Sequence, residues 1–270
     1  MAEAEPFEVY AIRYATVERR SDENYIGGDP HESQQMDYFV WLARNSQHTV
    51  VIDTGFDSHA AIRRRRQFLR SPDEGLRLLG VDAARVRDVI ITHLHYDHAG
   101  NLGLFPSARF HLQDREMAYA TGRYMGLGFF SHAYEADDVV TAVRLVYGGR
   151  FVFHDGDGQV VPGMTVHHIG GHTRGLQAVR VWTRVGWLVL ASDAAHYSAN
   201  MIESRPFPVV ADVTEMADGW RKLRALACAP EHIVPGHDPS VMLTYRAPAP
   251  DLEGIAVRLD EKPHSPSLSY

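Results

Sequence analysis

Three histidines and an aspartate occupy four of the six positions from His93 to His98, directly after a run of β-branched residues. Imidazole and carboxylate groups bind zinc and its neighbours in the first transition row. A tight loop at the end of a strand can direct alternate side chains toward two adjacent points. We therefore expect His93 and His95 to serve one metal ion, and Asp97 and His98 to serve a second. The alternative is a histidine-rich surface loop.

Further candidate ligands follow three strands predicted downstream. A single histidine or aspartate after a strand is more often a turn, cap or satisfied residue than a ligand. Their recurrence at the same end of several predicted strands makes chance an unlikely explanation. These groups are His172 after the strand at 164–169, Asp193 and His196 after the strand at 187–192, and His237 after the strand at 232–234.

From about Phe7 to His237 the chain resembles the metallo-β-lactamase superfamily, and within it most closely the N-acyl homoserine lactonases. The HxHxDH loop that begins at His93 is the most specific part of this resemblance. The other motifs are Val51-Ile52-Asp53-Thr54-Gly55, Gly171-His172-Thr173, Ser192-Asp193-Ala194 and Pro235-Gly236-His237.

The resemblance implies seven ligands for two metal ions. Zinc is favoured because His95 stands where the di-iron flavoproteins of the superfamily carry Glu, although manganese, iron or cobalt would also fit. Asp53 would accept a hydrogen bond from a ligand histidine and orient it; the alternative is a turn carboxylate. The implied ligands are His93, His95 and His172 for one ion, Asp97, His98 and His237 for the other, and Asp193 as the bridge.

Two metal ions that share one water predict a hydrolase. Zinc lowers the pKa of bound water to about 7, so a metal-bridging hydroxide would serve as the nucleophile at neutral pH. One ion can polarise a carbonyl while the other receives the departing oxygen, which suits a lactone because its leaving group stays tethered. Asp97 or Asp193 could pass the proton to the leaving alkoxide.

One position departs from the lactonase pattern, in which the bridging Asp is followed by two small residues and Tyr. Here His196 takes that place and Tyr197 comes next. We expect His196 to donate a hydrogen bond to the developing oxyanion. The alternatives are that His196 only packs beside the site, or that a shifted loop gives the role to Tyr197. Candidate substrate-binding residues are Tyr124, Met125, Phe129, Phe130 and Phe207, and for the stretch at 124–134 the alternative is a hydrophobic plug of the core.

The predicted function is therefore opening of a small lactone, with an acyl homoserine lactone as reference substrate. Another cyclic ester or a cyclic amide competes with it, and a thioesterase or phosphodiesterase is less favoured. Zinc β-lactamases of the commonest class carry Cys where Asp193 stands, and glyoxalase II continues into a helical domain where only a short stretch follows His237. A metabolite sensor without catalysis is the alternative from another class.

Composition limits the partners. The formal net charge is −7, which would repel nucleic acid. No run reaches the roughly 18 apolar residues of a membrane helix, and no apolar core with a cleavage site opens the chain, so we expect a cytoplasmic protein with no membrane partner. A homodimer is an open expectation. Cys228 is the only cysteine, so no disulfide forms within the chain, and it is predicted to be a small buried residue on a helix.

Four consecutive arginines, Arg63 to Arg66, form the one conspicuous charge run. Consecutive residues of a helix point in different directions, so at most one or two could face a single ligand. We expect a solvated helix, with an anion-binding patch as the alternative.

Two sets of strands must position these side chains. With 45% hydrophobic residues, the chain can bury a large core as one domain over residues 1–260, followed by a mobile tail over 261–270. The fold class is α/β, and the resemblance implies a four-layer αββα sandwich. The first strand set is predicted at 8–15, 37–44, 49–53, 89–92 and 109–112, and the second at 150–153, 164–169, 178–184, 187–192 and 232–234. Helices are predicted at 75–79, at 82–86, after 114 and at 213–226.

Overall fold

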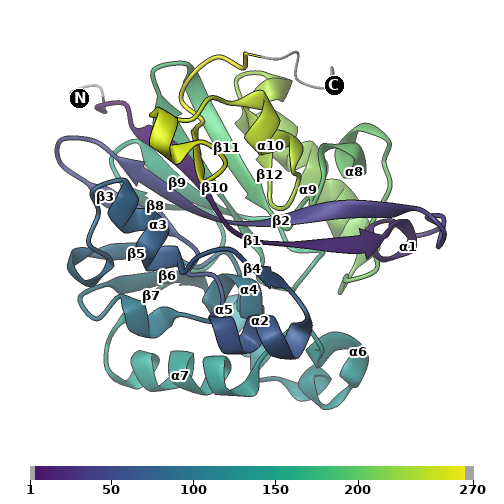
Figure 1. Ribbon diagram of the computed structural model, residues 1–270. Coiled ribbons are helices and arrows are strands. Elements are labelled where there is room, and N and C mark those ends of the chain that lie inside the picture. Colours follow the sequence, from purple (N-terminus) through teal and green to yellow (C-terminus); the bar gives the residue numbers. More distant parts are fainter. Residues whose placement is uncertain (1–3, 265–270) are drawn as a thin grey trace.

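Two β-sheets packed face to face, with helices on both outer faces, form a single α/β domain in this computed structural model, which describes residues 4–264 (Figure 1). The strands of the first sheet are β1 (Glu8–Arg20), β2 (Ser33–Arg44), β3 (Thr49–Ile52), β4 (Gln67–Phe68), β5 (Asp88–Ile90), β6 (Arg109–Gln113), β7 (Phe151–His154) and β13 (Ala256–Arg258). Those of the second are β8 (Gly158–Val161), β9 (Met164–His168), β10 (Gln177–Thr183), β11 (Gly186–Ser192) and β12 (Ile233–Pro235).

The first sheet has the order β13-β1-β2-β3-β5-β6-β7 with β4 paired to β1, and the second has the order β12-β11-β10-β9-β8. Strands β3, β5, β6 and β7 pair in parallel, as do β11 and β12. The α-helices are α1 (Ser21–Asn24), α2 (Ser58–Arg64), α3 (Pro72–Leu78), α4 (Tyr96–Ala99), α5 (Asp114–Ala120), α6 (Gly128–Ser131), α7 (Ala136–Tyr147), α8 (Ser198–Ile202), α9 (Val213–Leu226) and α10 (Ser240–Thr244). Short 3₁₀ turns are η1 (Ala83–Arg85), η2 (Leu102–Leu104), η3 (Arg123–Gly126), η4 (Pro230–His232) and η5 (Pro250–Leu252).

Alternating side chains divide the interior into layers. Leu188 and Leu190 of β11 face the first sheet, where they join a core that contains Trp41 of β2. Val189 and Ala191 face the other way and pack with helices α8 and α9. A third core lies between the first sheet and helices α2, α3, α5 and α7. Because successive residues of a strand point to opposite faces, each sheet is buried on both sides, and the predicted αββα sandwich is confirmed.

Helix α9 shows how local sequence sets an element. The Asp212 carboxylate accepts hydrogen bonds from the backbone N–H groups of Thr214 and Glu215, which caps the helix start. Met216, Trp220 and Leu223 then recur at helical spacing and are buried. The bounds agree with the predicted helix at 213–226.

Two expectations about elements are wrong. The strand predicted at 150–153 was assigned to the second sheet, but β7 pairs in parallel with β6 of the first, with Phe110 opposite Phe151. Helix α7, which is not among the predicted helices, supplies the crossover that such a parallel pair needs. Cys228 is exposed and follows the end of α9, rather than being buried on a helix.

Within residues 4–264 no helix combines the length and apolar character that crossing a bilayer requires. Most of the tail predicted at 261–270 lies outside the described residues.

The ends of strands from both sheets meet at one rim. Two residues there adopt left-handed backbone conformations although they are not glycine, Asp53 directly after β3 (φ 62°) and Ser192 at the end of β11 (φ 47°). Such conformations cost free energy and tend to mark functional sites. At Gly236, after β12, a Cβ atom would lie 2.9 Å from Asp193 Oδ1, so only glycine fits beside that carboxylate.

Candidate metal centre

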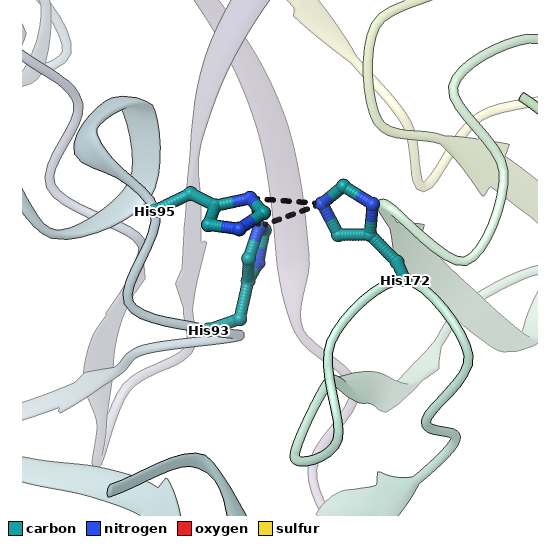
Figure 2. Close-up of side chains that lie close together, drawn as sticks. All are labelled: His93, His95 and His172. Carbon is teal, nitrogen blue, oxygen red and sulfur yellow. Dashed lines mark hydrogen bonds between the residues drawn. The ribbon is translucent and has the colours of Figure 1, made fainter. Parts of the chain in front are cut away.

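Three buried imidazoles form the first group of candidate ligands (Figure 2). His93 and His95 come from the loop between β5 and α4, and His172 comes from the turn after β9. His93 Nε2 lies 3.0 Å from His95 Nδ1, and His172 Nε2 lies 3.2 and 3.0 Å from these two atoms. Burial, reinforced by the neighbouring imidazoles, holds the pKa values of His93 and His95 well below their usual range. The rings are therefore neutral, the form that binds metals.

A second group contains Asp97 and His98 of α4 and His237 after β12. Asp97 Oδ2 lies 3.7 Å from the Nε2 atoms of both histidines. Burial alone would lower the pKa of His98, but Asp193, Asp97 and Asp53 around it raise that pKa well above its usual value. The second group is thus richer in negative charge than the first.

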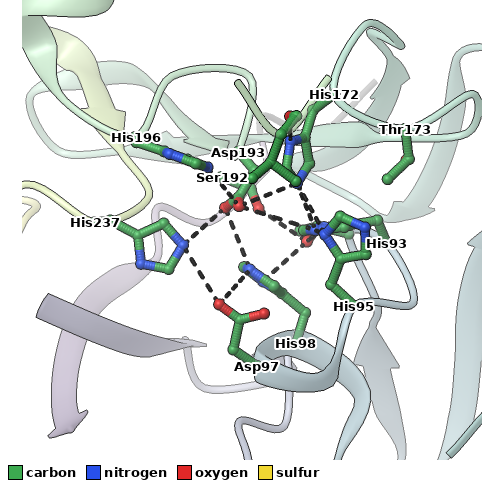
Figure 3. A network of polar contacts seen from close by, with 12 residues as sticks. His93, His95, Asp97, His98, His172, Thr173, Ser192, Asp193, His196 and His237 are labelled. Carbon is green, nitrogen blue, oxygen red and sulfur yellow. Dashed lines mark hydrogen bonds and ion pairs between the residues drawn. The ribbon is translucent and has the colours of Figure 1, made fainter. Parts of the chain in front are cut away.

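Asp193 lies between the two groups (Figure 3). Its Oδ1 atom is 3.2 Å from His98 Nε2 and 3.1 Å from His237 Nε2. Its Oδ2 atom is 3.3 Å from His172 Nε2 and 3.9 Å from His93 Nε2. Each oxygen of one carboxylate therefore faces a different group, which is the arrangement that a bridging ligand requires.

Hydrogen bonds on the outer side of three rings fix which nitrogen faces inward. A carbonyl or carboxylate oxygen accepts a hydrogen bond, so the Nδ1 atom of each ring carries a proton and the Nε2 atom is the one turned toward the cluster. The acceptors are the Asp53 carboxylate for His98 (2.7 Å), the Val209 carbonyl for His172 (2.6 Å) and the Asp37 carbonyl for His237 (2.8 Å).

The donor set fits metal ions. Although Asp193 Oδ1 and His98 Nε2 are buried and 3.2 Å apart, neither atom makes a hydrogen bond. Leaving such a buried atom unpaired costs about 1–3 kcal/mol, a loss that a shared cation would remove. The clusters whose ligand atoms lie within 4.8 Å of one another are His93, His95 and His172; His93, His98 and Asp193; Asp97, His98 and His237; and His172, Asp193 and His196.

Asp53 holds ligands of both groups in place. Besides the bond from His98, its carboxylate accepts hydrogen bonds from Thr92 N (2.7 Å) and Thr92 Oγ1 (2.8 Å). The Thr92 hydroxyl oxygen in turn lies 3.1 Å from His93 Nδ1. These contacts fit an outer acceptor, and the role of Asp53 in orienting metal ligands stays a prediction.

Replacing Asp53 with Asn should weaken metal binding about 10- to 100-fold, the usual effect of losing an outer partner of a metal ligand. Asn tolerates the left-handed backbone at this position, so the change removes charge and acceptor capacity while keeping the shape. A competition titration with a chelator measures the effect. Asp57→Ala, which removes an exposed cap of α2, is the control; equal losses in both variants would trace the effect to stability.

His196 lies against the bridging carboxylate, with Nε2 3.0 Å from Asp193 Oδ2. Its ring stacks on Phe207, with centroids 3.7 Å apart. Burial lowers the pKa of His196 to about 3, against the opposing effect of Asp193. The Tyr197 hydroxyl, by contrast, donates to the Gln35 carbonyl (3.1 Å).

A cavity of about 90 Å³ opens onto the cluster. Of the predicted substrate-binding residues, Tyr124 and Phe129 are 45% and 61% exposed, and Met125 lines a separate apolar pocket of about 590 Å³ beside α7. Phe130 packs against the core beneath them, and Phe207 is buried behind His196. The cavity is lined by Arg19, Met36, Tyr38, Arg64, Arg66, His95, Tyr96, Asp97, His132, Ala133, His172, Asp193, His196, Val209 and His237.

Sequence reasoning missed a buried carboxylate that joins two ligand segments. Glu116 of α5 accepts hydrogen bonds from Leu94 N (3.0 Å), Tyr134 Oη (2.9 Å), Thr173 Oγ1 (2.6 Å) and Gly175 N (3.1 Å). It thereby ties the loop of the first two histidines to the turn of the third. No spacing in the sequence links Glu116 to these partners, which meet only in the folded chain. The cavity residues Arg19, Arg64 and Arg66 were likewise not assigned to the site.

Comparisons with known proteins agree with this geometry. The family model described as the Metallo-beta-lactamase superfamily matches residues 35–237. N-acyl homoserine lactonase AttM of Rhizobium johnstonii is 30% identical over 177 residues, 63% of this chain, and the match spans 65% of that relative, just under two thirds of its length. Acyl-coenzyme A thioesterase MBLAC2 of Gallus gallus is 27% identical over 219 residues, which are 73% of this chain and 71% of that protein.

Among solved structures, a quorum-quenching N-acyl homoserine lactone lactonase superposes with a TM-score of 0.75 and 20% identity, covering 88% of this chain and 95% of its own. AidC, described as a dizinc quorum-quenching lactonase, gives a TM-score of 0.65 and 14% identity over 88% of this chain and 89% of its own. These likenesses concern the fold. Because the family match spans every candidate ligand from His93 to His237 and the sandwich agrees with it, the chain belongs to the metallo-beta-lactamase superfamily.

Proposed function

We propose that this protein is a metal-dependent hydrolase that opens a small lactone, with an acyl homoserine lactone as the reference substrate. The observation that carries the proposal is Asp193, whose two oxygens face two separate groups of buried ligands. Relatives and solved structures named as N-acyl homoserine lactonases support the same reaction class.

Two zinc ions, or manganese, iron or cobalt in their place, would supply Lewis acidity toward the substrate carbonyl and a water acidic enough to attack near neutral pH. The chain's own residues orient the ligands and move a proton. The buried imidazoles turn the nitrogen that can bind a metal ion inward, and Asp97 at the cavity wall can pass a proton to the leaving oxygen. The ligands would be His93, His95, His172, Asp97, His98, Asp193 and His237.

Thioester hydrolysis is the second candidate, because a relative named as an acyl-coenzyme A thioesterase matches 73% of the chain. A compact ring would fit the cavity of about 90 Å³ beside the ligands. Since a lactone keeps its leaving group tethered, both parts of the product stay in one small space. We therefore favour the lactone over the thioester.

A substrate screen separates these reactions. On protein loaded with zinc, we expect kcat/KM for the best lactone to exceed that for an acyl thioester, a bis-aryl phosphodiester and a cephalosporin by about 10²-fold or more. Acid release measures hydrolysis of lactones of several ring sizes, and chromogenic assays measure hydrolysis of the thioester, the phosphodiester and the cephalosporin. If the thioester or the phosphodiester were the best substrate and no lactone turned over, the proposal would be wrong. Binding of lactones without any hydrolysis would indicate a sensor.

A further inference from the structure

The run of four arginines divides between solvent and the metal cavity. Arg63 and Arg65 are exposed, whereas Arg64 and Arg66 are partly buried and line the cavity. The cause is local: Arg65 ends α2 in a left-handed conformation (φ 55°), and the chain turns there into β4. This turn brings Arg64 and Arg66 to the same wall. The expectation of a wholly solvated helix therefore does not hold for these two residues.

Arg64 is fully engaged by the protein. Its Nε atom donates to Glu135 Oε1 (2.8 Å), and its other nitrogens donate to the carbonyls of His132 (3.0 Å) and Tyr134 (3.3 Å). The guanidinium carbon also lies 3.9 Å from the centre of the Tyr96 ring. Arg64 thus fastens the 132–135 segment to α2 and has little capacity left for a ligand.

Arg66 and Arg19 are engaged far less. Arg66 Nε donates to the Tyr96 hydroxyl (3.1 Å), and Arg19, from the distal half of β1, makes only long contacts to Met36 Sδ (3.5 Å) and the Glu23 carbonyl (3.4 Å). Among residues 4–264, no carboxylate oxygen lies within 4 Å of a guanidinium nitrogen of Arg19 or Arg66, whereas Arg64 has such a partner.

Two guanidinium groups without carboxylate partners are unusual at the wall of a small cavity in a protein of net charge −7. A neutral lactone could offer them only carbonyl oxygens, which accept hydrogen bonds but carry no full negative charge. Guanidinium groups bind carboxylates through paired hydrogen bonds, and Arg is preferred where such recognition is needed. The charge pattern of the cavity therefore favours a substrate that is itself an anion.

We propose that this cavity selects cyclic esters that carry a carboxylate, with the ester at the histidine and aspartate cluster and the carboxylate on Arg66 and Arg19. The inference rests on the proposed lactonase function, because it names the class of lactone. Arg66, which lines the cavity together with Asp97, is the principal anion-binding residue, and Arg19 of the β1–β2 hairpin lines the same cavity.

The kinetic test compares two substrates that differ only in charge, 5-oxotetrahydrofuran-2-carboxylate and its primary amide. In the zinc-loaded protein we expect kcat/KM to be at least about tenfold higher for the acid, through a lower KM. Arg66→Met should reduce the acid-to-amide ratio about 10- to 100-fold, the range for lost hydrogen bonds to a charged group. Arg19→Met should reduce it less, and Arg66→Lys should restore part of it.

Arg63→Met is the matched control, since Arg63 carries the same charge in the same run of arginines but is exposed on α2. It should leave the ratio unchanged. An equal preference for acid and amide in the unmodified protein would overturn the inference. So would a ratio that Arg66→Met and Arg19→Met both leave unchanged, because the arginines would then serve only the fold.

A binding measurement keeps this inference separate from the reaction. By calorimetry on the zinc-loaded protein, glutarate should bind at least about tenfold more tightly than butyrate, and Arg66→Met should remove most of that difference. If no lactone were hydrolysed but the difference depended on Arg66, the proposed reaction would fail and the anion site would stand. If lactones were hydrolysed but glutarate gained nothing over butyrate, the anion site would be refuted.

Discussion

Replacing Asp193 with Ala should reduce turnover of the best lactone by more than the factor of about 10² to 10³ that the loss of a single electrostatic donor costs. The reason is that its two oxygens face both ligand groups, so one substitution weakens both ion sites and leaves two cations less neutralised. Elemental analysis should find about two transition-metal ions per unmodified chain and at most one in the variant.

His132→Ala is the control for this prediction. His132 is exposed at the wall of the same cavity, but its Nδ1 atom bonds to the Phe129 carbonyl rather than to the cluster. Its loss should leave the metal content unchanged and cost much less turnover. Full activity in unmodified protein that holds one ion or none would contradict the dinuclear arrangement, as would an Asp193→Ala variant that keeps two ions.

Several candidate ligands could be predicted because they follow a strand end closely. Asp193 comes directly after β11, His237 comes shortly after β12 and His172 shortly after β9, so the sheet sets their positions. The order of residues around His93 then matches a known family pattern. The local spacing and the overall fold both place these residues at the rim where the strand ends of the two sheets meet. The spacing alone was therefore enough to predict that they lie together.

The presence of Arg19, Arg64 and Arg66 at the cavity could not be predicted in the same way. Helical periodicity spreads Arg63 to Arg66 around a helix, whereas the left-handed Arg65 ends α2 and turns Arg66 back toward the cavity. An arginine in such a conformation is uncommon, so its sequence gives no warning of it. Arg19 is a similar case, because it lies near the end of β1, which forms a long hairpin with β2 (Figure 1), and its place at the cavity depends on that hairpin.

Sheet membership also depended on tertiary contacts. The apolar residues of β7 would fit either sheet by composition. The crossover helix α7 lets β7 pair in parallel with β6, and this places β7 in the first sheet. Only Ala142 of that helix is fully buried, and Val139 and Leu145 pack against the core as partly buried residues, although apolar residues do recur at helical spacing in its sequence. The role of Glu116 could not be predicted either, because its four hydrogen-bond partners come from other segments of the chain.

His196→Ala should lower the turnover number by about 10² to 10³ while the metal content stays at the unmodified level. His196 lines the cavity three residues after Asp193, and its Nε2–H, which donates to Asp193 Oδ2 here, would be free for a developing oxyanion once the Asp193 oxygens bound metal ions. Stacking on Phe207 fixes the plane of the ring, which keeps that donor aimed. Pre-steady-state kinetics on the lactone isolates the chemical step, and elemental analysis checks the metal.

Tyr197→Phe is the companion variant and should keep near-native turnover. The Tyr197 hydroxyl donates to the Gln35 carbonyl and the ring packs against Tyr25, and Tyr197 is not among the residues that line the cavity. A role of His196 in packing alone would lower the melting temperature of His196→Ala and leave turnover per folded molecule intact. Near-native turnover of His196→Ala beside a crippled Tyr197→Phe would show instead that the tyrosine keeps the role it has in the lactonase pattern.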